Sequence, residues 1–422
     1  MRNLIIIFVL IFFQSFAQKV DFDKFFIKKT MRIDYIHTGN SNSEQIFFKQ
    51  IKQEPYWGGS LVNLIDTFYY GRYYINVFDL KTNKLIYSKG YNTLFQEWQV
   101  YDEAKTISKS FYETVTFPYP KDSILFTISR RNKKGKFNEI YRQKIYPSDF
   151  MINKESIAKA NTFKIHYSGA SSEKLDIVFL FDGYTAKDKE KLHSDAERFA
   201  NYFWDYEPFK SYKNNINIWA VETYSQESGT DIPGDSIWRN TLFNTSFYTF
   251  RAERYLTTQD VKTVRDYAAN VPYDQIYIIV NTDKYGGGGI YNFWNIVASD
   301  HKLAKYVFLH EFGHGFAGLA DEYVDEDIPE DTYDRTVEPW EPNITNLVDF
   351  NKKWKNMVDK NTPVPTPEQQ KYYNKVGVFE GAGYVAKGVY RPYYLCEMRK
   401  LKTGFCPVCT DAISKMIRFY SK

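Results

Sequence analysis

The apolar pattern of this chain changes once along its length, and that change limits the folds it can adopt. Before about residue 150, the apolar residues fall in short segments rich in aromatic and β-branched side chains, separated by turn-forming residues. These segments are residues 32–37, 73–80, 113–117, 124–129 and 139–145. Such a pattern is typical of antiparallel strands. Residues 174–181 instead form an almost continuous apolar run, which is typical of a strand buried on both faces.

Beyond that run, apolar strands alternate with helical patterns. The expected strands are residues 174–181, 215–222 and 275–281, and the expected helices are residues 186–203 and 258–269. This alternation indicates an α/β core with a mostly parallel sheet. We therefore predict two domains, an antiparallel β-sandwich over residues 18–150 and an α/β domain over residues 151–422. The sandwich has no catalytic cluster, so we expect it to support the second domain or recruit its substrate.

Residues 1–17 have the pattern of a secretory signal peptide. Arg2 precedes an apolar run of ten residues, 4–13, and the small residues Ser15 and Ala17 fit a cut after Ala17. A membrane-spanning helix needs roughly 20 apolar residues, so we favour cleavage over a retained anchor. We expect an exported protein, periplasmic or extracellular, with no membrane anchor in the mature chain. The formal net charge of +4 comes with no long basic run, so nucleic acid is not an expected partner.

One short motif points to chemistry. The residues His310-Glu311-Phe312-Gly313-His314 lie in an apolar helical pattern that spans residues 303–320. Residues four apart share one face of a helix, so both imidazoles can bind a single Zn²⁺ at about 2.0–2.1 Å. Glu311 projects beside them, where a carboxylate can take a proton from water activated by the metal. We predict that His310 and His314 are zinc ligands and that Glu311 is the catalytic base.

A catalytic zinc needs a third protein ligand, and no histidine follows His314. Gly318 is placed to end the helix, and Asp321 follows three residues later, so a turn can return its carboxylate to the metal. We predict Asp321 as the third ligand. Its neighbour Glu322 and the more distant Glu330 remain as alternatives.

Three stretches together, residues 310–323, 285–291 and 182–185, resemble the IgA peptidase family of bacterial metallopeptidases. The resemblance covers essentially the whole mature chain. It implies a β-rich front domain, a metzincin-like zinc peptidase domain, and endopeptidase activity on a protein or peptide substrate. It also implies that Met398 forms the turn beneath the metal, as an apolar floor and not as a ligand. The substrate that names the family does not transfer with fold and motif alone.

Two loops carry further predictions. Four consecutive glycines, Gly286, Gly287, Gly288 and Gly289, expose backbone to which a peptide substrate can add a strand, although a flexible turn explains them equally well. The acidic, Gly-rich residues 227–235 allow a Ca²⁺ site, with a solvated loop as the alternative.

The three cysteines, Cys396, Cys406 and Cys409, allow one local disulfide in three pairings, and the sequence does not choose among them. A zinc site there is disfavoured, because no nearby histidine completes it. The sequence is also compatible with two functions besides peptidase activity. One is an exported binding module with a vestigial zinc site, and the other is a zinc amidase that acts on cell-wall material.

Overall fold

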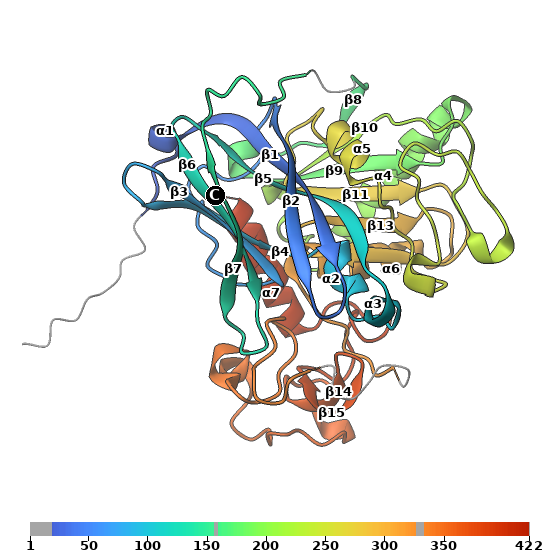
Figure 1. Ribbon diagram of the computed structural model, residues 1–422. Helices are drawn as coiled ribbons and strands as arrows, with labels where there is room; N and C mark the ends of the chain where they lie inside the picture. The colour runs from blue at the N-terminus through green and yellow to red at the C-terminus, as the bar shows by residue number, and fades with distance from the viewer. Residues whose placement is uncertain (1–18, 156–158, 326–332, 422) are drawn as a thin grey trace, which may run out of the picture.

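The computed structural model describes residues 19–155, 159–325 and 333–421 (Figure 1). The expected signal peptide and Glu330 lie outside the described residues.

The first part of the chain forms two antiparallel sheets that pack face to face. One sheet has the order β2-β1-β5, and the other has the order β4-β3-β6-β7. The strands are β1 (Phe26–Gly39), β2 (Glu44–Glu54), β3 (Tyr73–Asp79), β4 (Leu85–Tyr91), β5 (Lys109–Pro120), β6 (Ile124–Arg131) and β7 (Phe137–Ile145). Ile33 and Phe117 of the first sheet share one buried core with Ile75 and Phe126 of the second. The predicted sandwich is therefore confirmed, and β2 and β4 join the strands that the sequence indicated.

The second part contains a six-stranded sheet of order β12-β13-β11-β9-β10-β8. Its strands are β8 (Thr162–His166), β9 (Leu175–Asp182), β10 (Ile216–Val221), β11 (Gln275–Val280), β12 (Gly287–Ile290) and β13 (Trp294–Ala298). The four central strands are parallel, and the two edge strands β12 and β8 are antiparallel to their neighbours. The predicted α/β core is confirmed. Every residue of β9 is buried, as its apolar run requires.

Helices cover both faces of this sheet. Phe179 and Phe181 face a core that includes α4 (Lys189–Trp204), α6 (Ala304–Ala317) and α7 (Pro407–Tyr420). Val178 and Leu180 face the opposite core, with α5 (Val261–Ala268) and α2 (Leu94–Trp98). Two short helices, α1 (Phe22–Phe25) and α3 (Glu103–Thr106), belong to the first part, and β14 (Phe379–Ala382) and β15 (Val385–Arg391) form a separate hairpin. Because α2 comes from the first part, the two predicted domains share a core.

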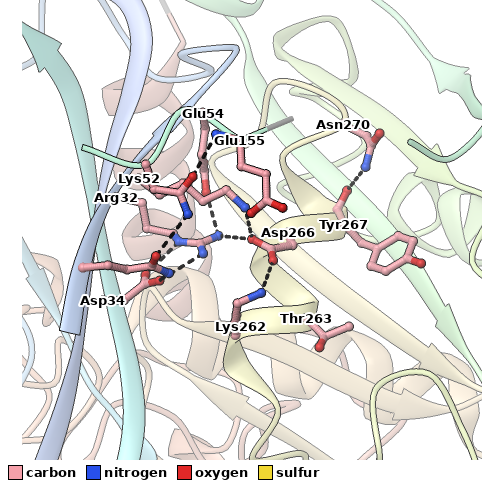
Figure 2. A network of polar contacts seen from close by, with 12 residues as sticks. Arg32, Asp34, Lys52, Glu54, Glu155, Lys262, Thr263, Asp266, Tyr267 and Asn270 are labelled. Atoms are coloured by element: carbon pink, nitrogen blue, oxygen red, sulfur yellow. Dashed lines mark hydrogen bonds and ion pairs between the residues drawn. The ribbon is translucent and has the colours of Figure 1, made fainter. Parts of the chain in front are cut away.

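A buried charge cluster also joins the two parts (Figure 2). Arg32 on β1 is fully buried, and its guanidinium donates to Asp266 Oδ1 on α5 at 2.8 Å. Lys52 on β2 donates to the same oxygen, also at 2.8 Å. Burial alone raises the pKa of Asp266, but the opposing charges of Arg32 and the lysines outweigh burial and hold it at about 2. An ionised Asp266 therefore attaches the sandwich to the α/β part.

Among the described residues, no helix has both the length and the apolar character that crossing a membrane requires.

Candidate metal centre

The centre lies at the C-terminal end of α6, where the chain turns sharply. Gly318 has φ +63°, a left-handed conformation that glycine adopts without strain. The N–H of Gly318 donates to the C=O of His314 at 3.0 Å, and the N–H of Leu319 donates to the C=O of Gly313 at 3.1 Å. These bonds end the helix and turn the following residues back toward it.

This turn places Asp321 beside the two histidines of α6. The His310 and His314 Nε2 atoms are 3.1 Å apart, and Asp321 Oδ1 is 3.0 Å from the first and 3.5 Å from the second. Two nitrogens that are each about 2.05 Å from one zinc ion at a tetrahedral angle lie about 3.3 Å apart, so the spacing fits. The imidazoles are 13% and 17% exposed, which leaves the group accessible to solvent.

Hydrogen bonds at the far side of each ring fix which nitrogen faces this position. His310 Nδ1 donates to the C=O of Glu397 at 3.0 Å, and His314 Nδ1 donates to the C=O of Leu319 at 2.6 Å. A carbonyl oxygen only accepts, so each neutral imidazole carries its proton on Nδ1 and directs the Nε2 lone pair toward Asp321. Asp321 Oδ1 is buried without a hydrogen-bond donor. When both histidines are neutral, three acceptors converge on one point, an arrangement that a cation stabilises.

The second carboxylate oxygen of Asp321 is held by the β14–β15 hairpin. Tyr384 donates its hydroxyl to Asp321 Oδ2. Tyr384 has φ +70°, and such strain in a residue other than glycine persists only where its surroundings enforce it. Those surroundings are backbone bonds, because the N–H groups of Gly383 and Tyr384 donate to the C=O groups of Asp321 and Tyr323 at 2.9 and 3.0 Å. The hairpin therefore orients Asp321 so that Oδ1 faces the histidines.

Met398 packs against the same helix from another side. Its side chain is fully buried, and a Cβ added at Gly313 would lie 2.8 Å from the Met398 sulfur. Gly313 lies between the two histidines on α6, so the absence of a side chain there lets Met398 approach. The neighbouring Glu397 supplies the carbonyl that accepts from His310. The structure thus places Met398 next to the centre, where an apolar floor would be.

Glu311 lies between α6 and the glycine strand β12. A Cβ at Gly287 would come within 3.0 Å of Glu311 Cγ, and a Cβ at Gly289 would collide with the Glu311 carbonyl. The glycines therefore let β12 approach the helix. Burial raises the pKa of Glu311 above its ordinary value, and the two histidines oppose that shift. A carboxylate with a raised pKa accepts protons more readily, which suits a general base.

The outer edge of β12 is already partly paired. The N–H of Gly287 donates to the C=O of Arg254 at 3.3 Å, and the N–H of Leu256 donates to the C=O of Gly287 at 3.2 Å. At Tyr291, just beyond the strand, the C=O accepts from the N–H of Asn92 at 2.9 Å. Gly289 has the same orientation as Gly287, because alternate residues face the same edge. Gly287 and Gly289 therefore both face the outer edge, and Gly287 is already paired there. The part of this edge that remains open to a substrate strand is thus much shorter than the four predicted glycines.

Several residues near the centre gave no signal in the sequence. Arg254 is exposed and donates to the Tyr323 hydroxyl at 3.2 Å, and its charge interacts favourably with Asp321. Glu97 on α2 accepts from the Tyr255 hydroxyl, and burial raises the pKa of Glu97 to about 7. With Tyr384, these residues are far from the His-Glu-x-x-His motif in the chain, so no local spacing identifies them.

Glu322, the adjacent alternative for the third ligand, points elsewhere. Its Oε1 accepts from Asn343 at 2.9 Å and from the Cys409 thiol at 3.2 Å. The structure groups Asp321 with the two histidines and Glu322 with the three cysteines. All three cysteines are free thiols, so the structure forms none of the three disulfides that the sequence allows.

The acidic loop proposed for Ca²⁺ uses its carboxylates in other ways. Glu227 accepts from the N–H of Asn240, and Asp231 accepts from the N–H of Arg239, each at 2.6 Å. Neither of the two groups able to hold a metal within the described part of the chain includes this loop. The calcium prediction therefore has no support.

Two family models match the chain. The model described as IgA Peptidase M64 matches residues 163–375 and 368–417, and the model described as Peptidase M64 N-terminus matches residues 21–142. The first match includes the six-stranded sheet apart from its first residue, Thr162, and the candidate metal centre, and the second includes most of the β-sandwich. No curated protein matches the chain. The two matches together confirm the resemblance that the motifs indicated, and the chain belongs to the IgA peptidase family of zinc metallopeptidases.

Proposed function

We propose that the protein is an exported endopeptidase that holds one zinc ion on His310, His314 and Asp321 and uses Glu311 as its general base. The observation that carries this proposal is the convergence of three metal-binding acceptors beside a partly buried glutamate. Zinc is the metal that the family implies. Two imidazoles and one carboxylate are also ligands that catalytic zinc sites use.

The residues divide the chemical work as follows. A zinc ion held by these three ligands would supply a Lewis acid for the scissile carbonyl and would lower the pKa of a bound water. Glu311 accepts the proton of the attacking water and passes it to the leaving amine. Tyr323 and Arg254 are candidate donors for the negative charge that develops on the substrate oxygen, because both interact electrostatically with Asp321 and a 3.2 Å hydrogen bond joins them.

Two other functions make different demands on the site. A binding module with a vestigial zinc site would have no use for the partly buried Glu311, whose desolvation costs free energy that a catalytic role explains. A zinc amidase acting on cell-wall material would use the same centre, but the family consists of peptidases. Protein or peptide is therefore the favoured substrate class.

Export is part of the proposal because residues 1–17 have the composition of a cleaved signal peptide. Expression of the full gene product in a bacterial host, with fractionation and N-terminal sequencing, tests it directly. We expect a mature chain that begins at Gln18 in the periplasm or medium. An uncleaved chain that stays with the cytoplasm or membrane would refute export.

The activity is tested with casein and a peptide library, with and without chelator. We expect internal peptide cleavage that stops on chelation and returns with added zinc. Glu311→Gln should keep its zinc and lose most of the cleavage, on the order of 10²-fold or more. Glu197→Gln, which changes an exposed glutamate on α4, is the matched control and should retain full activity. Full activity in Glu311→Gln would contradict the assigned role. Cleavage of cell-wall peptides but not of casein would favour the amidase.

A further inference from the structure

The three cysteines and Glu322 form a second group with the composition of a metal site. Their sulfur and carboxylate atoms all lie within 4.8 Å of one another, and all four residues are buried. The elements that contribute them are far apart in the chain. Glu322 follows the turn after α6, Cys396 is two residues before Met398, and Cys406 and Cys409 begin α7.

The spacing of the sulfurs fits a shared metal better than a disulfide. Cys396 Sγ and Cys409 Sγ are 3.6 Å apart. A disulfide has a sulfur–sulfur bond of about 2.05 Å. Two thiolates that are each about 2.3 Å from one zinc ion at a tetrahedral angle lie about 3.8 Å apart. The observed separation is close to the second value without any rearrangement.

Glu322 provides a second, independent observation. The residue is completely buried, and its Oε2 has no hydrogen-bond partner. Its other oxygen, Oε1, already accepts from Asn343 at 2.9 Å, which orients the carboxylate toward Cys409. A buried, unpartnered carboxylate oxygen is unfavourable unless a cation or a donor satisfies it. The oxygen that faces the thiols is Oε1, 3.2 Å from Cys409 Sγ, so a metal ion among the thiols would take this carboxylate as its fourth ligand.

The position of Cys406 also favours thiolate. Cys406 is the N-cap of α7, and its sulfur accepts from the N–H of Cys409 at 3.5 Å. The N-terminal end of a helix stabilises negative charge, and cysteine binds metals as thiolate.

We propose that Glu322, Cys396, Cys406 and Cys409 bind a second, structural zinc ion, separate from the catalytic one. Four protein ligands, most of them thiolates, are typical of structural zinc sites, because they fill the tetrahedral coordination shell and leave no position for water. No histidine lies near the three cysteines in the sequence, and the carboxylate of Glu322 takes the place of the fourth ligand.

A metal ion at this site would connect segments of the catalytic centre that are far apart in the sequence. Glu322 is adjacent to the ligand Asp321, and its N–H donates to the C=O of Met398 at 2.8 Å. Cys396 is adjacent to Glu397, whose carbonyl orients His310. One ion thus fixes the Asp321 loop, the segment around Met398 and the start of α7 to one another. Its role is positional, and it does not touch substrate.

The test counts metal in the full-length protein after the catalytic ligands are removed. We expect about two zinc ions per wild-type chain and one in the double variant His310→Ala/His314→Ala, measured by mass spectrometry of the metal. Adding Cys409→Ser to the double variant should remove the remaining ion. A double variant without bound zinc would overturn the proposal.

Because a cysteine variant can fail to fold, two measurements on the double variant itself keep the test decisive. Reconstitution with Co²⁺ should give the near-ultraviolet charge-transfer absorption of thiolate bound to cobalt, and its absence would overturn the proposal. Alkylation after unfolding without reductant should label all three cysteines. Labelling of one cysteine, with a chain mass lower by two hydrogens, would show a disulfide and refute the metal site.

Discussion

Gly313→Ala tests the packing beneath the metal centre through the sign of its effect on stability. In an ordinary helix interior, replacing glycine by alanine stabilises by about 1 kcal/mol, because glycine loses more conformational entropy on folding. Here the new Cβ would lie 2.8 Å from the sulfur of the buried Met398 and 3.2 Å from Leu319 Cδ1. Ordinary contact begins at 3.4 Å, so Met398 or α6 must move by about 3.4 − 2.8 = 0.6 Å.

The magnitudes predict no gain in stability. Forcing an extra methyl group into a packed core costs about 1–3 kcal/mol, which offsets or exceeds the gain in helix propensity. We therefore expect a free energy of unfolding that is unchanged or lower by up to about 2 kcal/mol. A displacement of 1 Å at a catalytic site can cost about 10²-fold in rate, so a shift of 0.6 Å predicts a loss of kcat of about tenfold.

A double-mutant cycle with Met398→Ala isolates the contact. In the Met398→Ala background the space is open, so Gly313→Ala should now stabilise the protein by about 1 kcal/mol. Urea unfolding of the four proteins gives the coupling energy, and hydrolysis of a fluorogenic peptide gives kcat. If Gly313→Ala stabilises the wild type by about 1 kcal/mol and shows no coupling to Met398, the packing described here is wrong.

Three further predictions concern the Asp321 loop, the proton at the centre and the attachment of the sandwich. Tyr384→Phe removes the hydroxyl that holds Asp321 Oδ2 and should weaken zinc binding by about 10–100-fold in a chelator competition. Unchanged zinc affinity would contradict the role of Tyr384 in orienting Asp321. Burial lowers the pKa of His314, but the charge of Asp321 outweighs burial and raises this pKa to about 9 in the metal-free protein. Zinc must therefore displace a proton from His314, and the affinity for zinc should fall about tenfold per pH unit below pH 9. A pH series of the chelator competition checks this. Asp266 has its pKa lowered from 3.8 to about 2, so its ionised form stabilises the fold above pH 4 and this contribution is lost as the pH falls through 2. One pKa unit corresponds to about 1.4 kcal/mol, so Asp266→Asn should reduce the free energy of unfolding at neutral pH by about 2 kcal/mol. If the difference in unfolding free energy between the variant and the wild type does not change with pH, this explanation is wrong.

Local patterns in the sequence predict the layers of the fold and the two proposed ligands that lie within one turn of each other. The buried run that became β9 and the spacing of His310 and His314 are set by periodicity, which needs no knowledge of distant contacts. Gly318 likewise marks the end of α6, because its left-handed conformation is a local property.

The rest of the centre depends on contacts between segments that are far apart in the chain. Tyr384 reaches Asp321 only because the hairpin docks on the ligand loop, and Glu322 reaches Cys409 only because α7 packs beside α6. The absence of a nearby histidine argued against metal at the cysteines, yet the fold brings a carboxylate there. Gly287 seemed available to substrate, but residues 254–256 pair with it after folding.

The most direct test of the central claim is a crystal structure of the protein purified with zinc, with anomalous data collected on both sides of the zinc absorption edge. We predict an anomalous peak within bonding distance of His310 Nε2, His314 Nε2 and Asp321 Oδ1, at about 2.0–2.2 Å from each. The absence of a peak there in zinc-loaded protein would contradict the assignment of these residues as the catalytic metal centre.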